Sequence, residues 1–296
     1  MGFEEVRKPT WLRIRPPEKN AFTKMKTPLR KYKLNTVCEE AHCPNMSECW
    51  SKGTATFMIL GETCTRACRF CAVKTGNPKK FVDINEPKNI AEAVKEMHLD
   101  YVVLTSVCRD DLEDQGASHF SECIKEIKKL SNDIFVEVLI PDFSNNKEFL
   151  KKVIDANPDV IAHNIETVKS MQKEVRDRRF NYENSLSALR YVKELNPKIY
   201  TKSSIMVGLG ETEFEVMDAM KDLRRIDVDF LTIGQYLRPS DWHLKIKEFI
   251  APEKFDDYKR AGLELGFLYV ASGPFVRSSY NAGEFFIKNI FRRAVC

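Results

Sequence analysis

Strand-like and helix-like segments alternate six times in this chain, and that alternation is the strongest constraint on its fold. Each apolar run is followed by an amphipathic segment. The paired ranges are 55–60 with 89–97, 101–107 with 118–130, 134–140 with 147–156, 160–165 with 184–195, 199–207 with 213–226, and 230–236 with 252–265. Repeated alternation of this kind predicts parallel strands joined by right-handed crossovers, in a doubly wound sheet or a barrel.

The number of units favours a partial barrel, because a complete barrel of this type has eight of them. The apolar runs are short and nearly continuous, as is typical of strands covered on both faces. We therefore expect an α/β fold, a partial (β/α)6 TIM-type barrel over residues 54–266. An N-terminal extension at 1–53, punctuated by prolines and predicted to be irregular, precedes the barrel, and a C-terminal extension at 267–296 follows it.

Composition and charge limit the classes of function. With 43% hydrophobic and 30% charged residues, the chain is predicted to be globular rather than fibrous or disordered. Residues 1–33 hold ten Lys or Arg against three Glu, so this arm either binds an anionic partner or is simply solvated. No apolar run is long enough to span a bilayer, and the first residues include Glu4 and Glu5. We expect a cytoplasmic location.

The nine cysteines are unevenly distributed. Six of them fall within residues 38–71, whereas Cys108, Cys123 and Cys296 are scattered. In a reducing compartment, clustered cysteines indicate metal binding or catalysis rather than disulfides.

Cys64, Cys68 and Cys71, here called the loop triplet, are spaced C-x3-C-x2-C directly after the first predicted strand. Active sites of parallel barrels form at this end of the strands. Three thiolates can bind three irons of a cubane cluster and leave the fourth iron open to a substrate or cofactor. Zinc is the main alternative, although structural zinc uses four ligands and no nearby histidine supplies the fourth.

Cys38, Cys43 and Cys49, the N-terminal triplet, are spaced C-x4-C-x5-C among polar neighbours, which argues against a simple packing role. His42 is either a further ligand or a solvated residue. Spacing alone leaves open one site shared by all six cysteines, or one site in each of two protomers.

Several motifs together resemble a known family. The loop triplet with Phe70 before its last cysteine resembles the signature of radical S-adenosylmethionine enzymes. With the N-terminal triplet and the C-terminal Arg277-Ser278-Ser279-Tyr280, the chain resembles the lipoyl synthase family from about residue 8 to 290. Further similarities lie at 8–13, 105–112 and 162–167, with one departure at Cys108, where the family usually carries Asp.

The resemblance implies a sulfurtransferase that uses two 4Fe–4S clusters and S-adenosylmethionine. A cluster on the loop triplet is implied to bind S-adenosylmethionine and to generate a 5′-deoxyadenosyl radical. The radical removes hydrogen first from the sixth and then from the eighth carbon of an octanoyl chain held on a carrier lysine. A second cluster, on the N-terminal triplet, is implied to donate both sulfur atoms.

The resemblance also implies roles for single residues. Ser279 corresponds to a serine ligand of the second cluster; the alternative is that Ser278 and Ser279 cap a tail helix beginning near Ala282. Phe70 is either a contact of the adenine or a core aromatic. The remaining candidate contacts of cofactor or substrate are Thr105, Asn164, Glu166, Lys202 and Tyr236.

The implied partners are octanoylated lipoyl domains of 2-oxoacid dehydrogenase E2 subunits and the glycine cleavage H protein. An electron donor and cluster-assembly proteins are also implied, and acidic carriers suit the basic arm. We expect a monomer that binds neither nucleic acid nor a membrane. Two alternatives stay open at this point: a tRNA-modifying methylthiotransferase, for which no RNA-binding module is visible, and a zinc-stabilised binding protein without catalysis.

Overall fold

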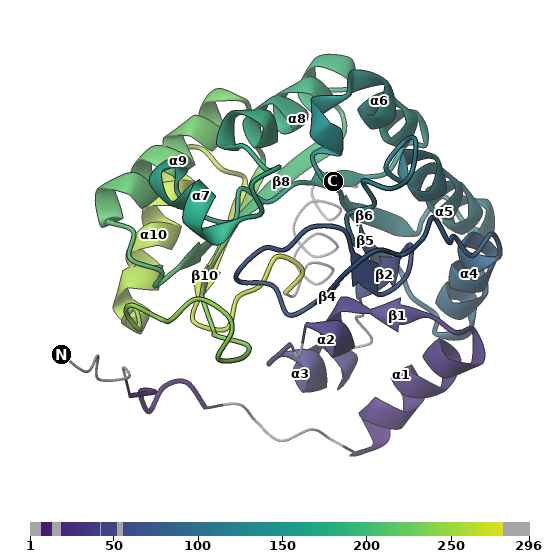
Figure 1. The fold of residues 1–296 in the computed structure, drawn as a ribbon, viewed down its shortest axis with the longest axis horizontal. Coiled ribbons are helices and arrows are strands. Elements are labelled where there is room, and N and C mark those ends of the chain that lie inside the picture. The colour runs from purple at the N-terminus through teal and green to yellow at the C-terminus, as the bar shows by residue number, and fades with distance from the viewer. Residues whose placement is uncertain (1–6, 14–18, 42, 52–55, 281–296) are drawn as a thin grey trace, which may run out of the picture.

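A curved, eight-stranded sheet forms the centre of the molecule (Figure 1). The computed structural model describes residues 7–13, 19–41, 43–51 and 56–280. The strand order is β1-β2-β5-β6-β7-β8-β9-β10, in which β1 is antiparallel to β2 and every other pair is parallel. Helices cover the outer side of the curve. The predicted α/β class is therefore confirmed, and within the described residues the sheet stays open, with β1 and β10 at its two edges.

The strands are β1 Asn35–Thr36, β2 Thr56–Ile59, β3 Thr63–Cys64, β4 Lys74–Thr75, β5 Tyr101–Ser106, β6 Phe135–Leu139, β7 Val160–Ala162, β8 Tyr200–Val207, β9 Phe230–Gln235 and β10 Tyr269–Gly273. The helices are α1 Lys19–Lys31, α2 Val37–Glu40, α3 Met46–Ser51, α4 Glu86–Glu96, α5 Ala117–Leu130, α6 Lys147–Asp155, α7 Gln172–Val175, α8 Tyr182–Leu195, α9 Glu213–Arg225 and α10 Pro252–Glu264, with 3-10 turns at Phe143–Asn145 and Lys169–Met171. None of these helices is long and apolar enough to cross a membrane.

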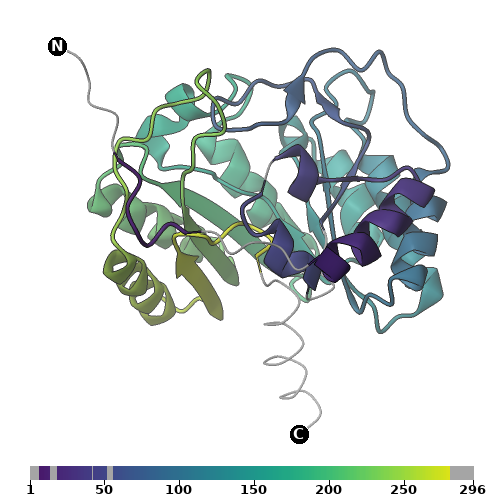
Figure 2. The ribbon, with the colours of Figure 1, turned by 90° about the horizontal axis from the view of Figure 1, so that it is seen from below.

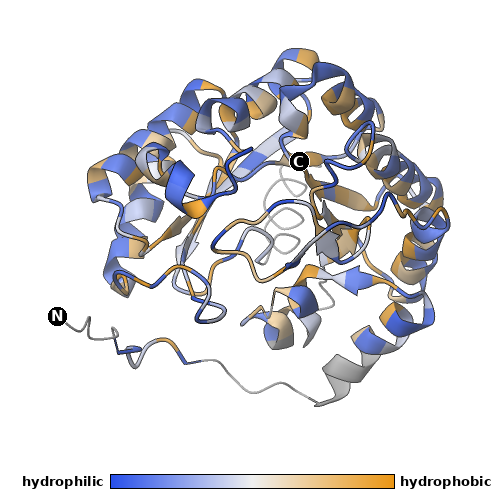
Figure 3. Ribbon diagram, in the orientation of Figure 1, coloured by the Kyte–Doolittle hydropathy of each residue, from blue (hydrophilic) through white to orange (hydrophobic). Residues whose placement is uncertain are grey.

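All six predicted strand–helix units are present, with boundaries shifted by a few residues. Three of the helices begin at a residue whose side chain caps the first turn. Asn146 and Asn181 accept hydrogen bonds from the first backbone amides of α6 and α8, and Thr212 forms a reciprocal capping box with Glu215 at α9. Figure 3 shows the apolar faces of these helices turned toward the sheet.

The two extensions differ from the sequence-based expectation. β10 lies within the predicted C-terminal extension, yet it pairs along its whole length with β9 as a further parallel strand. The expectation of irregular backbone at 1–53 was wrong for α1, α2 and α3. These short helices depend on tertiary packing, since Met25 and Leu29 of α1 are buried in the main core. The division of the chain into 1–53, 54–266 and 267–296 stays a prediction.

The lower half of the barrel lumen is filled. Side chains alternate along a strand, so the first residues of β5, β6, β8, β9 and β10 all face the lumen at the same level. These residues are aromatic and pack together as Tyr101, Phe135, Tyr200, Phe230 and Tyr269. Because this aromatic layer closes the amino-terminal end of the lumen, open space can exist only toward the carboxyl ends of the strands.

The C-terminal segment crosses the sheet close to the N-terminal extension. The backbone oxygen of Val276 lies so near Gly234 of β9 that an added Cβ would come within 2.0 Å of it. The amide of Asn45 donates a hydrogen bond to the backbone oxygen of Phe275 at 2.6 Å, and the Tyr280 hydroxyl lies 3.1 Å from a carboxylate oxygen of Glu48. Residues 45–48 and residues 275–280 are thereby held against each other.

The absence of a side chain at Gly234 is expected to be essential for the position of residues 274–280. A Gly234→Ala substitution forces the backbone at Val276 away and should lower the free energy of unfolding by about 1–3 kcal/mol. Hydrogen exchange at 274–280 should rise in parallel. Gly273→Ala is the matched control, because its Cβ would lie 3.4 Å from the Val276 side chain, an ordinary contact. Equal exchange in the two variants would contradict the prediction.

Candidate functional site

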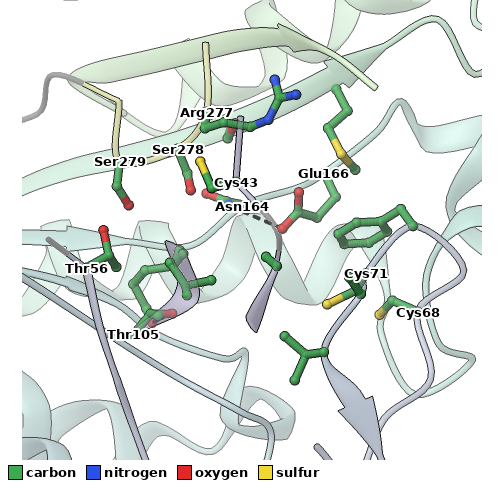
Figure 4. A pocket seen from close by; sticks show the side chains of 18 of the residues that line it. Cys43, Thr56, Cys68, Cys71, Thr105, Asn164, Glu166, Arg277, Ser278 and Ser279 are labelled. Atoms are coloured by element: carbon green, nitrogen blue, oxygen red, sulfur yellow. Dashed lines mark hydrogen bonds between the residues drawn. The ribbon is translucent and has the colours of Figure 1, made fainter. Parts of the chain in front are cut away.

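A cavity of about 550 Å³ lies at the carboxyl ends of the parallel strands. Figure 2 shows the blue segment around β3 and β4 and the light-green segment after β9 at this same end of the molecule. All but one of the predicted site residues line the cavity, namely Cys38, Cys43, Cys49, Cys64, Cys68, Phe70, Cys71, Thr105, Asn164, Glu166, Tyr236 and Ser279. The structure therefore brings both cysteine triplets and the C-terminal motif to one space (Figure 4).

Lys202 does not line the cavity, and its assignment as a contact of cofactor or substrate is corrected. It is the third residue of β8 and lies just above the aromatic layer, where its ammonium group pairs with the Glu137 carboxylate at 2.7 Å. The Tyr101 hydroxyl donates to the same carboxylate. Lys202 thus compensates a buried charge in the floor of the lumen, and Ser204 and Met206 are the β8 side chains that face the cavity.

The loop triplet is anchored by Arg66, which lies between its first two cysteines. Arg66 is 2% exposed, and its guanidinium group contacts Asp110 at 2.8 Å and Asp142 at 2.9 Å. Asp110 follows β5 and Asp142 follows β6, so one side chain ties the loop to the ends of two strands. Thr65 adds a hydrogen bond of 2.6 Å to Asp110. This bonding fixes the loop backbone and orients its sulfur atoms.

A second set of contacts holds the loop from the opposite side. The Asp177 carboxylate accepts a hydrogen bond from the Ala67 amide at 2.9 Å, and the Asp177 amide donates to the sulfur of Cys68 at 3.3 Å. Arg179 donates to the backbone oxygen of Thr65 at 2.6 Å. The hydrogen bond from Arg179 holds the pKa of the Asp177 carboxyl well below its usual range, so this anchor stays ionised.

The thiols of the loop triplet differ in acidity. Burial raises the pKa of Cys68 to about 12 and that of Cys71 to about 11. The pKa of Cys64 is lowered, chiefly by a hydrogen bond from the thiol of Cys108. Thiolates, not thiols, bind metals, so occupation of this site by iron would release protons from the two buried thiols.

The N-terminal triplet is buried between α2, α3 and the C-terminal segment. Cys38 and Cys49 are 6% and 9% exposed, and burial raises the pKa of Cys38 to about 11 and also raises that of Cys43. Ser278 and Ser279 line the same cavity as Cys43, and Figure 4 shows the side chains of all three. The predicted tail helix from Ala282, together with His42 and Cys296, lies outside the described residues.

The donor sets fit iron–sulfur clusters. In the described part of the chain no three His, Cys, Asp or Glu side chains converge as ligands of a single metal ion. A cubane differs from a single ion because each thiolate binds a different iron. Soft thiolate donors held in a buried cavity are the ligands such clusters require.

Asn164 and Glu166 provide a polar wall opposite the loop triplet. The Asn164 amide donates to the Glu166 carboxylate at 3.1 Å, and burial raises the pKa of Glu166. Within the described residues, the Asn164 side-chain oxygen has no hydrogen-bond partner although it is buried. Glu166 has a positive φ of 66°, a conformation that costs free energy and is frequent at ligand sites. A polar ligand in the cavity would satisfy the Asn164 oxygen.

Thr105, Phe70 and Tyr236 line the cavity but also have structural contacts. The Thr105 hydroxyl donates to the backbone oxygen of Leu139 at 3.1 Å. Phe70 packs against the apolar cluster that contains Tyr236, and the Tyr236 hydroxyl donates to the backbone oxygen of Leu244 at 2.9 Å. Tyr236 therefore positions the loop after β9, which in turn contacts the cysteine loop through a hydrogen bond of 3.1 Å from the Leu244 amide to Arg69.

A buried chain of polar residues beside the cavity was missed by the sequence interpretation. The Nδ1 atom of His163 lies 2.8 Å from the backbone oxygen of Ile140, and its Nε2 atom lies 2.9 Å from the Ser185 hydroxyl, which accepts a hydrogen bond from Arg176 at 2.9 Å. Because the Ile140 partner is a carbonyl, His163 carries its proton on Nδ1. Arg176 stacks on the ring of Phe180, with Arg66 on the same ring. The one sequence signal for these buried polar residues was the similarity at 162–167, which includes His163.

Burial of His163 predicts a pH dependence of stability. Burial and the nearby Arg176 charge lower the pKa of His163 from its ordinary 6.5 to about 4. The unfolded chain therefore binds more protons between these values, and stability should fall by about 3 kcal/mol as pH decreases from 6.5 to 4. Urea unfolding across this range is the measurement.

His163→Asn is the control for this titration, because its amide can still donate to the Ile140 oxygen but does not ionise. The variant should be less stable than wild type at pH 7 and should lose less stability on acidification. If the free energy of unfolding falls equally with decreasing pH in both proteins, a group other than His163 is responsible for the pH dependence.

Comparisons with known proteins identify relatives for nearly the whole chain. The profile of the radical SAM superfamily matches residues 58–223, and that of the N-terminal domain of lipoyl synthase matches residues 2–43. A lipoyl synthase of Halobacterium salinarum is 56% identical over 97% of this chain and 93% of its own length. The mitochondrial lipoyl synthase of Trichoplax adhaerens is 53% identical, over 96% of this chain and 83% of the relative.

The relatives vary in length. The apicoplast lipoyl synthase of Plasmodium knowlesi is 52% identical over 96% of this chain, which spans 64% of that protein. Among solved structures, methylornithine synthase PylB has a TM-score of 0.56 at 13% identity, covering 84% of this chain and 70% of its own. The FeFe-hydrogenase maturase HydG from Carboxydothermus hydrogenoformans has a TM-score of 0.55 at 17% identity, covering 86% and 58%. At this level of identity, these similarities concern the fold alone.

Proposed function

This chain belongs to the lipoyl synthase family of radical S-adenosylmethionine enzymes, and we propose that it inserts two sulfur atoms into an octanoyl group held on a carrier lysine. One observation carries the proposal. Two separate cysteine triplets line the same cavity as Ser279, although Ser279 lies more than two hundred residues after both triplets in the sequence. A single space with two thiol sets suits a reaction that couples radical formation to sulfur transfer.

Membership of the radical SAM superfamily implies one 4Fe–4S cluster and S-adenosylmethionine. We assign that cluster to the loop triplet, and a second cluster to the N-terminal triplet with Ser279. When bound, the first cluster supplies the electron that cleaves S-adenosylmethionine, and the second supplies the two sulfur atoms. An alkoxide is a harder ligand than a thiolate, so Ser279 suits an iron that must be released once sulfur is removed.

The chain's own residues bind and orient the reactants. Arg66 and Asp177 hold the loop triplet rigid, and the unsatisfied oxygen of Asn164 is available to a hydroxyl or ammonium donor of the cofactor. Apolar walls from Val107, Leu139 and Val276 suit a hydrocarbon chain and exclude water. Exclusion of water and of stray hydrogen donors protects a radical formed in the cavity.

The partners follow from the proposed substrate, because an acyl chain on a lysine arrives on a carrier protein. Lipoyl domains of 2-oxoacid dehydrogenases and the glycine cleavage H protein are the proposed carriers, with an electron donor and cluster-assembly proteins as further partners. A monomer without nucleic-acid or membrane partners stays a prediction. So does the cytoplasmic location, because relatives include mitochondrial and apicoplast proteins.

Iron and sulfide content after anaerobic reconstitution tests the proposal. Wild type should hold about eight irons, and the Cys38→Ala/Cys43→Ala/Cys49→Ala variant about four, because each cubane contains four. The variant should no longer convert an octanoyl-lysine peptide to its lipoyl form. Cys123→Ala is the matched control, since Cys123 is a core thiol that does not line the cavity. Four irons in both proteins, or zinc in place of iron, would refute the proposal.

The two adjacent serines allow a sharper test of the ligand assignment. Ser279→Ala should lose at least about tenfold in lipoyl formation, because the proposed oxygen ligand is absent and cannot be replaced by a methyl group. Ser278→Ala, a change of identical size one residue away, should stay near wild type. Product formation and the spectrum of the second cluster are measured in both. A larger loss at Ser278 would reverse the assignment.

A further inference from the structure

The most exposed apolar side chains of the described residues lie at the end of the molecule where the cavity is found. The four most exposed large ones are Ile84 at 84%, Phe214 at 82%, Phe81 at 73% and Trp242 at 63%. Two of them lie between β4 and α4, one in the first turn of α9 and one after β9, and all of these segments follow the carboxyl ends of strands. Single exposed apolar residues are common, but Phe81 and Ile84 belong to one short loop and together indicate a contact surface.

The loop at 77–84 connects the cavity with a second hollow. It runs from β4 toward the start of α4 at the cavity end of the molecule (Figure 2). Thr75, just before the loop, lines the cavity. Lys80 and Ile84 line a separate hollow of about 600 Å³ against α4 and α5. A partner bound to this loop would therefore lie beside the cavity.

Although the 77–84 loop lies on the surface, its backbone is held in a defined conformation. Lys79 and Lys80 have positive φ values of 55° and 58°. The Asn77 side-chain oxygen accepts a hydrogen bond from the Lys79 amide at 2.8 Å, and the Asp111 carboxylate accepts one from the Lys80 amide at 2.9 Å. Two consecutive residues in the left-handed region cost free energy, and such strain is frequent where a chain contacts a ligand.

Asp111 ties this loop to the end of β2. Arg109 is 1% exposed and donates to the Asp111 carboxylate at 2.8 and 2.9 Å, while it also donates to the backbone oxygen of Leu60 at 3.0 Å. Leu60 follows β2, directly before the cysteine loop. The proposed reaction uses neither Arg109 nor Asp111, yet together they fix the 77–84 loop relative to the cavity. A preorganised loop loses little conformational freedom when a partner binds.

The lysines of this surface carry uncompensated positive charge. Lys79, Lys80 and Lys88 are exposed, and among the described residues none of them forms an ion pair. Three of the four carboxylates that line the hollow are already paired with lysines, as Asp114 is with Lys152 at 3.2 Å. Positive charge beside exposed apolar side chains complements a protein partner with an acidic surface.

We propose that the 77–84 loop is the docking surface for the carrier domain, and that an acidic face of that domain, next to its acylated lysine, contacts Lys79, Lys80 and Phe81. The inference rests on the proposed function, because it requires a substrate that arrives on a carrier. A domain bound to the loop is placed beside the cavity into which its acylated lysine extends.

The composition of the surface favours a protein over a nucleic acid or an anionic membrane. Phe81 and Ile84 provide apolar area, and the carboxylates of Asp83 and Glu113 are part of the same surface. A uniformly charged phosphate backbone is repelled by these carboxylates. A protein surface, in contrast, presents apolar groups and charges of both signs.

The experiment is an equilibrium titration of the reconstituted full-length enzyme with an octanoylated lipoyl domain of a 2-oxoacid dehydrogenase E2 subunit. Lys79→Glu/Lys80→Glu should weaken binding by about tenfold at low salt and by less at high salt, because salt screens exposed charges. Phe81→Ala should weaken binding by about tenfold at both salt concentrations, because an apolar contact is lost.

Conversion of a short octanoyl-lysine peptide, with dithionite as the reductant, is measured in parallel. The loop variants should convert the peptide at the wild-type rate, because the peptide has no domain to contact the loop. Lys198→Glu and Leu268→Ala are the matched controls. Both residues are exposed and directly precede β8 and β10, at the opposite end of the strands, so both variants should bind the domain as wild type does.

Three results would overturn the inference. Equal affinity for the lipoyl domain in wild type and the loop variants excludes docking there. Slower conversion of the peptide by the loop variants places the loop in the service of the cavity itself. A loss of activity seen only when a protein electron donor replaces dithionite makes the loop the surface for that donor. If wild type does not convert the peptide, the proposed function fails together with the inference; unchanged domain binding in the variants refutes only the docking surface.

Discussion

The buried guanidinium of Arg66 is the interaction on which the site depends. It lies inside the cysteine loop and pairs with Asp110 and Asp142, which follow two different strands. A buried arginine is tolerated only when its charge is compensated. The cysteine loop must therefore keep the position relative to the ends of β5 and β6 in which Arg66 reaches both carboxylates. The rigid sheet thereby determines where the sulfur atoms of the loop lie. A lysine would keep the charge but could not reach both carboxylates in the same planar geometry.

The N-terminal triplet depends on a different constraint, the contact of residues 45–48 with residues 275–280. Gly234 permits the backbone at Val276 to cross β9, and Asn45 is hydrogen-bonded to the neighbouring Phe275. The N-terminal triplet and Ser279 face one cavity only because of this crossing. Because the proposed ligands of the second cluster come from both extensions, binding of that cluster would couple the folding of both extensions to metal binding.

The lumen is divided by depth. Its floor consists of aromatic rings and the Lys202–Glu137 pair, which make no contact with the cavity and stabilise the barrel. Its upper part combines apolar walls with thiols, carboxylates and the buried chain from His163 to Arg176. The position of a side chain along its strand therefore decides whether it faces the floor or the cavity, as Lys202 and Ser204 of β8 illustrate.

The sequence by itself determined the order of strands and helices and the two cysteine spacings, because hydrophobic periodicity, helix caps and ligand spacing are local properties. The sequence also contains the motif at 277–280, whose resemblance to the family implies the role of Ser279. The tertiary structure decided the rest. It paired Lys202 with a carboxylate sixty-five residues away, added β10 to the sheet and placed Cys108 against Cys64. Such contacts depend on the register of parallel strands and on which side chains share one lumen, and neither can be read from neighbouring residues alone.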